Sequence, residues 1–457
     1  MIPNNALAEL KKIIAPGSLL TGPADLEEYA TDSTKMRFMP DAVAFPSTGE
    51  EIAQIFRLAN REYFPIIPRG GGSGKSGGAL PVKGGLVLAM DRFNRILHID
   101  TENLIARVEP FVITETFQNE VESLGLFYPP DPASADASTI GGNVAECAGG
   151  LRGLKYGVTG DYVLGLTVVL PTGEIIKTGV ETMKGVAGYD LTSLIVGSEG
   201  TLAVITSITL KLLPRPEAKK TMIVFFRVIE TAARTVSNII RGKVIPATLE
   251  FLDRMSIECV RSHIKFPIPD ETEAILLIEV DGSEMVVADD AEQVRKICMS
   301  SGATEFRLAA SKDEVEEIWE ARRKVSDSML DLKPGKISED VVVPRNRIPD
   351  LIRFLEELSK KYCLPIPAYG HAGDGNLHVN ILLDNTPDEK KRGEMVVREL
   401  LQRVIDLGGT ITGEHGIGIT KAMYMDMEFS PPAITLMKQI KGVFDPNNVL
   451  NPGKIFL

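Results

Sequence analysis

The chain has 457 residues, of which 44% are hydrophobic and 25% charged, and this composition is typical of a soluble globular protein with two or three domains. Its net charge of −12 argues against a nucleic-acid partner, and no apolar run is long enough for a membrane span. The N-terminus "MIPNNALAELKKIIAPGS" predicts an amphipathic helix rather than a signal peptide. None of the four cysteines forms a CxxC pair, which excludes an iron–sulfur ferredoxin module in this chain and indicates a cytoplasmic protein.

The first half of the chain predicts short strands with a few helices. A helix at about 4–14 is followed by strand, helix and strand over 41–69, and short strands follow at 86–90, 95–100 and 105–110. A helix is expected at 112–125. Residues 128–163 show little regular pattern, and a loop of this length in a compact domain is usually functional. Strands over 165–179 turn at "PTG", and "LTSLIVGSEGTLAVITSITLKLLPRPE" closes this half.

The second half has a different pattern, and "LLPRPEAKK" marks the boundary. Strands and helices alternate over 220–300, which predicts an α+β domain with an antiparallel sheet. Helices are expected at 312–330 and 348–362, with a strand at 340–344 between them.

The glycine-rich stretch "PIIPRGGGSGKSGGALPVKGG" resembles a phosphate-binding loop. The nucleoside-triphosphate motif needs a glycine where Arg69 stands, so that motif fails. The dinucleotide fingerprint fits over 72–77, but it requires a helix, and Pro81 and the Gly84–Gly85 pair leave no room for one. We therefore predict that the loop joins two strands and holds a pyrophosphate with its backbone N–H groups. The alternative is a mobile surface loop.

Three of the five histidines lie near the C-terminus, in "GHAGDGNLH" and "GEHGIG". His371, His378 and Glu414 are a set of three ligands that suits a zinc-like cation and leaves a position open for a substrate. The alternative for each histidine is an ordinary core or surface position. Successive side chains of an extended segment face opposite ways, so His415 should point away from Glu414 and remain available for acid–base work.

The helix at 312–330 carries Arg322 and Ser326 four positions apart, on one face. Arginine forms bidentate hydrogen bonds with a carboxylate, which makes Arg322 a candidate for substrate binding. The alternative is a solvated charged face.

Four motifs in one order carry a family resemblance: "PRGGGSGKSGGA" (68–79), "PPDPASADASTIGGNVAECAGGLRGLKYG" (129–157), "VGSEGTLAVIT" (196–206), and "GHAGDGNLHVN" (370–380) with "GEHGIG" (413–418). The chain resembles the flavin-linked 2-hydroxy-acid dehydrogenases of the vanillyl-alcohol oxidase/p-cresol methylhydroxylase superfamily, in the group that holds D-lactate dehydrogenase, D-2-hydroxyglutarate dehydrogenase and the D-type chain of glycolate oxidase. The resemblance implies an α+β fold. A helical segment (1–37) precedes a two-subdomain PCMH-type FAD-binding domain (38–216), and an α+β substrate domain (217–457) with an antiparallel sheet ends in a segment that returns to the flavin.

The resemblance also implies site residues. The cofactor residues would be Pro68, Arg69, Gly70, Gly71, Gly72, Ser73, Gly74, Ser76, Gly77, Pro132, Ser138, Thr139, Gly141, Gly142, Ala145, Gly149, Tyr156, Glu199, Gly200, Ile205 and Asn451. The metal ligands would be His371, His378 and Glu414, the catalytic base would be His415, and Arg322, Ser326, Asn380 and Lys336 would bind the substrate. Cys147 stands where the group usually has Asn. Neither flavin loop contains a histidine, so we expect non-covalent FAD.

The implied reaction is the oxidation of a D-2-hydroxy acid to a 2-oxo acid, assisted by a divalent metal, with zinc favoured over manganese and iron. Electrons would leave the flavin for an acceptor other than NAD: an electron-transferring flavoprotein, a cytochrome, a quinone or an iron–sulfur subunit. A homodimer is compatible with the sequence. Two alternatives remain open, a non-catalytic flavoprotein subunit of an electron-transfer complex and a related flavin transferase.

Overall fold

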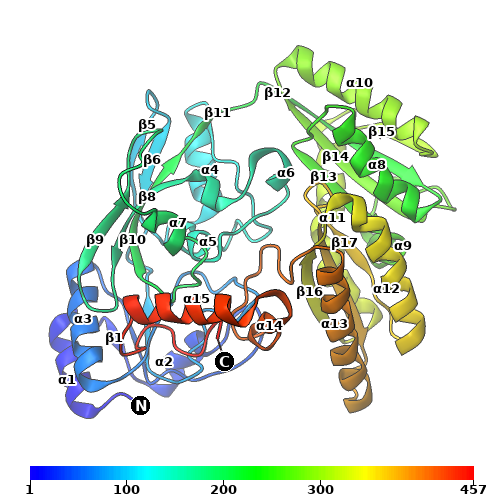
Figure 1. Ribbon diagram of the computed structural model, residues 1–457. Coiled ribbons are helices and arrows are strands. Elements are labelled where there is room, and N and C mark those ends of the chain that lie inside the picture. The colour runs from blue at the N-terminus through cyan, green and yellow to red at the C-terminus, as the bar shows by residue number, and fades with distance from the viewer. Residues whose placement is uncertain (457) are drawn as a thin grey trace. The chain divides into compact units, whose positions relative to one another are not determined.

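The structure is a computed structural model that describes residues 1–456, and its chain divides into two compact units (Figure 1). The first unit contains residues 1–149, 158–215 and the C-terminal segment from Glu414 onward. The second unit contains 150–157 and 216–413. Each unit mixes helices with sheets and has its own buried core.

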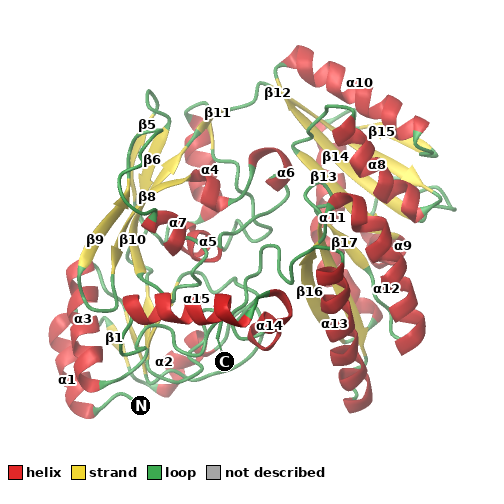
Figure 2. Ribbon diagram, viewed as in Figure 1, coloured by secondary structure: helices red, strands yellow, loops and turns green. Residues whose placement is uncertain are grey.

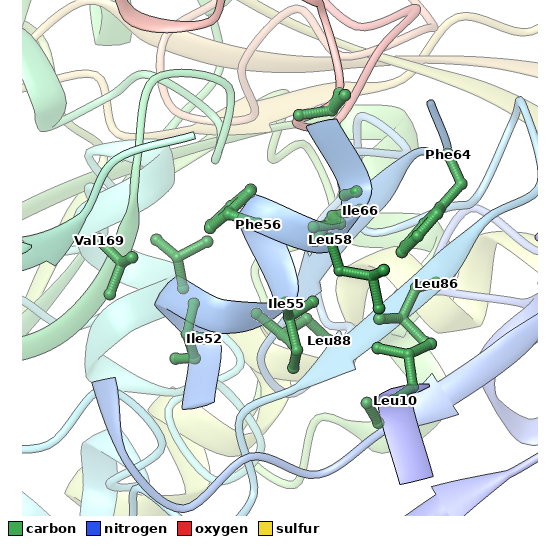
Figure 3. Packing of buried hydrophobic residues seen from close by; sticks show 14 of the residues in the cluster. Leu10, Ile52, Ile55, Phe56, Leu58, Phe64, Ile66, Leu86, Leu88 and Val169 are labelled. Atoms are coloured by element: carbon green, nitrogen blue, oxygen red, sulfur yellow. The ribbon is translucent and has the colours of Figure 1, made fainter. Parts of the chain in front are cut away.

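A four-stranded sheet begins the first unit, in the order β1 (Leu19–Leu20), β2 (Ala42–Ala44), β4 (Leu86–Ala89), β3 (Ile66–Arg69). Strands β2 and β3 both run parallel to β4. Helix α3 (Gly49–Glu62) begins at Thr48, whose side chain accepts a hydrogen bond from the N–H of Glu51, and it packs with α1 (Asn4–Ile13) on this sheet. Figure 3 shows the resulting core, with Leu10, Ile55 and Phe56 near the strand residues Ile66 and Leu88.

A five-stranded antiparallel sheet forms the rest of this unit, in the order β5 (Ile96–Asp100), β6 (Ile105–Val108), β10 (Val204–Lys211), β8 (Val163–Val169), β9 (Ile175–Gly179). The other helices and strands of the first unit are α2 (Pro23–Leu26), α4 (Thr114–Ser123), β7 (Leu126–Phe127), α5 (Ile140–Glu146), α7 (Leu191–Ile195), β11 (Leu213–Pro214), α14 (Met425–Glu428) and α15 (Pro431–Phe444).

The C-terminal segment is hydrogen-bonded to the first sheet. The N–H of Ile66 donates to the carbonyl of Val449 and the N–H of Asn451 donates to the carbonyl of Ile66, both at 2.7 Å. The last residues of the chain are therefore attached to β3, the strand that leads into the glycine-rich loop.

The second unit is built on one seven-stranded sheet in which every paired strand is antiparallel (Figure 2). The order is β15 (Glu305–Leu308), β12 (Ala218–Phe226), β14 (Ala274–Gly282), β13 (Thr248–Asp253), β17 (Ala368–Gly370), β18 (Asn376–Leu383), β16 (Gly335–Val342). Helices α9 (Arg254–Val260) and α11 (Lys312–Leu332) pack on alternate strand residues such as Ile223 and Phe225. The remaining helices are α6 (Gly153–Tyr156), α8 (Ile229–Arg241), α10 (Glu284–Ser300), α12 (Ile348–Tyr362) and α13 (Pro387–Asp406).

Most predicted elements are present. The glycine-rich loop joins strand β3 to strand β4 without a helix, and the second sheet is antiparallel, as expected. The expectation of little regular structure over 128–163 was wrong in part, because α5 and α6 lie there. We did not predict α13 or α15. None of the helices among the described residues is long and apolar enough to cross a membrane.

Candidate functional site

The glycine-rich loop lies against the second predicted cofactor segment. A Cβ atom on Gly70 would come within 2.5 Å of Thr139 Oγ1, and one on Gly71 within 2.2 Å of the carbonyl oxygen of Ala137. Such distances exclude any side chain, so the glycines are needed for the two backbones to approach. Thr139 also begins α5, since its hydroxyl accepts a hydrogen bond from the N–H of Gly142 at 3.2 Å.

Buried polar atoms near this loop indicate that it binds a polar ligand. Four such atoms have no hydrogen-bond partner: Asp32 Oδ2, Arg69 Nη1, Ser76 Oγ and Glu146 Oε2. Arg69 and Ser76 belong to the strand and loop themselves, and the residue after Asp32, Ser33, donates its N–H to the carbonyl of Gly72 at 3.1 Å. Buried polar groups are nearly always satisfied in folded proteins, so atoms of this kind are expected where a polar cofactor binds. The residues present fit a pyrophosphate-containing group.

Three predicted cofactor residues from distant parts of the chain meet beside this loop. The N–H of Glu199 donates to the carbonyl of Ala145 at 2.8 Å. Asn451 donates through Nδ2 to the carbonyls of Gly78 and Glu199, both at 3.0 Å. Glu199 is buried, has a φ of +52°, and accepts hydrogen bonds from two N–H groups of the 417–418 segment. This network fixes the C-terminal segment to the loop.

Tyr156, another predicted cofactor residue, belongs to the second unit. Its hydroxyl donates to Asp281 Oδ2 at 2.7 Å, and Lys155 donates through Nζ to Asp281 Oδ1 at 2.5 Å. Asp281 is on β14, so these two bonds attach the segment 150–157 to the large sheet. Tyr156 as a cofactor residue stays a prediction.

Two of the three predicted metal ligands, His371 and His378, belong to the second unit. The ligand atoms of His371, His378 and Glu414 all lie within 4.8 Å of one another. His371 directly follows β17 and His378 is on the neighbouring strand β18, and their ring centroids are 5.1 Å apart. Glu414 is joined by a peptide bond to Gly413, the last residue of this unit. Two imidazoles and a carboxylate are a suitable donor set for a divalent cation with an open position.

A fully buried glutamate stands behind His371. Glu250, on β13, lies 2.6 Å from His371 Nδ1 through Oε1. Its Oε2 accepts a hydrogen bond from Arg322 Nε at 2.6 Å and is 2.6 Å from Arg322 Nη2 in an ion pair. Burial alone would raise the pKa of Glu250, but Arg322 and His371 outweigh it and hold that pKa at about 2. A carboxylate on one ring nitrogen fixes the orientation of a histidine and leaves Nε2 as its ligating atom.

A second buried acid, Asp340, lies next to His378. The two residues are directly opposite each other on β16 and β18, and Asp340 Oδ1 is 3.8 Å from His378 Nδ1. Asp340 Oδ2 accepts from the N–H of Gly413 at 2.8 Å and from Thr412 Oγ1 at 3.1 Å. The same carboxylate therefore positions the backbone that carries Glu414.

The expectation that Glu414 and His415 face opposite ways was wrong. Residues 413–415 form a bend, not a strand, and His415 Nε2 is 4.0 Å from Glu414 Oε1. The alternation rule holds only for extended backbone, and the glycines on both sides of this pair allow the chain to bend here.

The predicted substrate residues all lie in the second unit. Arg322 is buried against the ring of Tyr369, and its Nη1 donors are not used by Glu250. Lys336 donates through Nζ to the hydroxyl oxygen of Ser326 at 2.6 Å, so these two lie together. Asn380 is buried, and its Oδ1 accepts from the Ser338 hydroxyl at 2.8 Å.

Sequence reasoning missed Glu250, Asp340, Glu146 and Lys454, which is also buried. A signal existed for Glu250, because it interrupts the apolar strand "ATLEFLD" with a charged residue. The other three gave no signal, because their neighbours come from distant parts of the chain.

Comparisons with known proteins agree with this geometry. Residues 40–179 match the model of an FAD binding domain, and residues 215–455 match FAD linked oxidases, C-terminal domain. The chain belongs to the FAD-linked oxidase family and is an FAD-dependent oxidoreductase.

Among its relatives is the glycolate oxidase subunit GlcD of Bacillus subtilis, which is 46% identical over 458 residues, covering 100% of this chain and 97% of the relative. A D-lactate dehydrogenase of Anaerostipes hadrus is 34% identical, covering 98% of this chain and 97% of the relative. A D-2-hydroxyglutarate dehydrogenase of Stutzerimonas stutzeri is 32% identical, with 98% of each chain covered.

Solved structures show the same fold at low identity. Substrate-bound p-cresol methylhydroxylase superposes with a TM-score of 0.79 at 18% identity, covering 99% of this chain and 96% of its own. An alkyldihydroxyacetonephosphate synthase superposes with a TM-score of 0.78 at 20% identity, covering 99% of this chain and 85% of its own. The predicted PCMH-type fold is confirmed.

Proposed function

We propose that this protein oxidises a small D-2-hydroxy acid, of the glycolate, D-lactate or D-2-hydroxyglutarate type, to the 2-oxo acid. The observation that carries the proposal is the group of His371, His378 and Glu414, with Glu250 behind it, in a chain of the FAD-linked oxidase family. Relatives along the whole chain are named for oxidation of such acids. Electrons then pass to an acceptor other than NAD.

When bound, FAD supplies a hydride acceptor, and a divalent ion on His371, His378 and Glu414, with zinc favoured, supplies a Lewis acid for hydroxyl and carboxylate oxygens. The chain's own residues have the remaining roles. His415 takes the hydroxyl proton on a ring nitrogen. Arg322 binds the substrate carboxylate through donors that Glu250 does not use, and its bond to Glu250 holds the guanidinium in one orientation. Ser326, Lys336 and Asn380 line the rest of the substrate site.

Anaerobic mixing of the purified holoprotein with glycolate, D-lactate and D-2-hydroxyglutarate tests the proposal. We expect one of them to bleach the oxidised flavin absorbance and to yield the 2-oxo acid. A flavoprotein that none of the three reduces, with metal present, would favour the alternative of a non-catalytic electron-transfer subunit. Acid precipitation should release all the FAD into the supernatant if the cofactor is non-covalent.

The metal and the base are tested separately. His378→Ala should lose the divalent ion by elemental analysis and most of the activity, while FAD stays bound. His415→Ala should keep both metal and FAD but reduce flavin about a hundred- to ten-thousand-fold more slowly in a single turnover. If His415→Ala empties the metal site, or if its reduction rate is unchanged, the assigned role of His415 is wrong.

Glu250→Gln tests the residue behind the ligands. It removes the charge but keeps the size, and we expect metal affinity to fall about ten- to a hundredfold. Glu258→Gln is a matched control, because Glu258 lies on α9 of the same unit, where it pairs with the neighbouring Arg261 near the surface. Equal metal affinities in both variants would show that Glu250 does not position His371.

A further inference from the structure

The first unit contains a group of buried and half-buried charged side chains beside the glycine-rich loop, and the function above uses only part of it. Glu146 ends α5, Asp32 lies between η1 (Glu27–Ala30) and β2, Glu199 follows α7, and Lys454 lies in the C-terminal segment. We call Asp32, Glu146, Glu199 and Lys454 the acid cluster. It contains three carboxyl groups and one ammonium group.

Glu146 lies against the loop. Its Oε1 would lie 3.8 Å from a Cβ atom on Gly74 and 3.0 Å from one on Gly78. Its Oε2 is buried without a hydrogen-bond partner and would lie 2.6 Å from a Cβ atom on Gly416. A carboxylate with this little solvation is unstable as a charge unless a cation or several donors are near.

Glu199, a second acid of the cluster, lies close to Glu146. Glu199 Oε1 lies 3.1 Å from the same Cβ position on Gly416. Glu199 accepts from the N–H groups of Ile417 at 2.8 Å and Gly418 at 2.6 Å, and these donors favour its charged form. Two carboxylates this close do not both stay charged easily, so a proton that the pair takes up binds to Glu146, which has no such donors.

The charged groups facing Glu146 support this assignment. Burial, then Glu199 and Asp32, raise the pKa of Glu146 well above its usual value, and Lys454 only partly opposes them. Lys454 donates to the carbonyl of Leu80 and to Asn451 Oδ1, and burial lowers its pKa to about 8. Arg69, at the start of the loop, is itself desolvated, which lowers its pKa.

FAD carries two negative charges on its pyrophosphate, and it must bind beside these three carboxyl groups. We propose that Glu146 takes up one proton from solvent when FAD binds, and that it then stays a neutral carboxylic acid that donates a hydrogen bond to the cofactor. The proton adds to one carboxylate oxygen, and no other bond forms or breaks. This inference rests on the binding of FAD by the first unit, and it adds Glu146 to the cofactor-binding residues.

Calorimetric titration of FAD into the flavin-depleted full-length protein tests the proposal, in pairs of buffers with different ionisation enthalpies. We expect net proton uptake that rises with pH between 7 and 9 and approaches one proton per FAD. The FAD dissociation constant should rise with pH, by about tenfold per unit where a full proton is taken up. Absence of FAD binding would contradict the proposed function, whereas binding without proton uptake would contradict only this inference.

Variants identify the proton's position. Glu146→Gln keeps the shape and a donor, so it should bind FAD with no proton uptake at pH 7 and with a flat pH dependence. Glu120→Gln, on the exposed face of α4, is the control and should behave as the wild type. Uptake that survives in Glu146→Gln but disappears in Lys454→Met would assign the proton to Lys454 and overturn the proposal. If Glu146→Gln does not fold, FAD release from the wild-type holoprotein must still increase with pH.

Discussion

Each unit of this protein contains a glutamate whose carboxyl group is shielded from water, and the two behave in opposite ways. Glu250 in the second unit is fully buried, yet Arg322 and His371 hold its pKa at about 2. Glu146 in the first unit faces Glu199 and Asp32, and burial together with these neighbours raises its pKa. Burial is common to both, so the neighbours decide which glutamate is charged. Glu250 acts as a fixed anion, and Glu146 can hold a proton.

The largest effect is expected from breaking the Glu250 pair. Arg322→Leu leaves a buried carboxylate without its cation, and we expect the free energy of unfolding to fall by about 3–5 kcal/mol. Arg323→Leu on the same helix is the control. Arg323 pairs with Glu316 at the surface, so its loss should change stability by less than about 1 kcal/mol. Urea unfolding measures the stability of both variants. Equal losses of unfolding free energy would contradict the assignment of Glu250 as a charged group that depends on Arg322.

The pH dependence of stability should have opposite signs for the two glutamates. The pKa of Glu250 is lowered from 4.5 to about 2, so its contribution, about 3 kcal/mol, is present above the unfolded pKa and is lost as pH falls toward 2. The raised pKa of Glu146 makes the flavin-free fold less stable as pH rises from about 4.5 through its folded value. Glu250→Gln should flatten the acid side of the unfolding curve and Glu146→Gln the neutral side. If the free energy of unfolding depends on pH in the same way in both variants, the two glutamates do not differ in charge as described.

A smaller effect is expected from the residue that attaches the C-terminal segment to the first unit. Asn451→Ala removes two hydrogen bonds to buried carbonyls, and we expect a loss of about 1–3 kcal/mol together with weaker FAD binding. Asn447→Ala is the control, because its bond to Asn60 is at the surface. Thermal unfolding and FAD titration check both variants, and a wild-type FAD affinity in Asn451→Ala would show that this residue does not shape the cofactor site.

The smallest effect concerns the ends of two helices, one in each unit. Cys147 directly follows α5 and Cys363 directly follows α12, and both have a left-handed backbone with φ of +53° and +52°. Asparagine tolerates this conformation better than cysteine, so Cys363→Asn should stabilise by about 0.5 kcal/mol. Cys147→Asn should stabilise the protein by the same amount only if the half-buried position has room for the larger amide side chain. Calorimetric unfolding measures the change. If Cys363→Asn is less stable than the wild type, the left-handed backbone does not explain the effect.

Much of the fold was predictable because it depends on local pattern. The absence of a helix after Arg69 followed from Pro81 and two glycines, and the antiparallel second sheet followed from the alternation of strands and helices. Helix α5 was missed because its glycines, Gly141 and Gly142, disfavour a helix and only tertiary packing stabilises it.

The candidate site was predictable only in part. The histidines stood out because of their rarity and the glycines because of their clustering. Glu250 and Glu146 did not, because their properties depend on partners far away in the sequence, such as Arg322 and Glu199. The geometry of Glu414 and His415 was predicted wrongly because a period-two rule was applied to a bend.

The path of the chain has a consequence for how the protein is made. The chain passes from one unit to the other four times, after residues 149, 157, 215 and 413. The last segment supplies Asn451 and Lys454 to the glycine-rich loop. These residues are synthesised after residues 216–413, so the first unit cannot be completed before the second-unit segment has been made. Cofactor loading is then expected to follow synthesis of this segment, and a truncation that removes Asn451 and Lys454 should yield a protein that retains its flavin poorly.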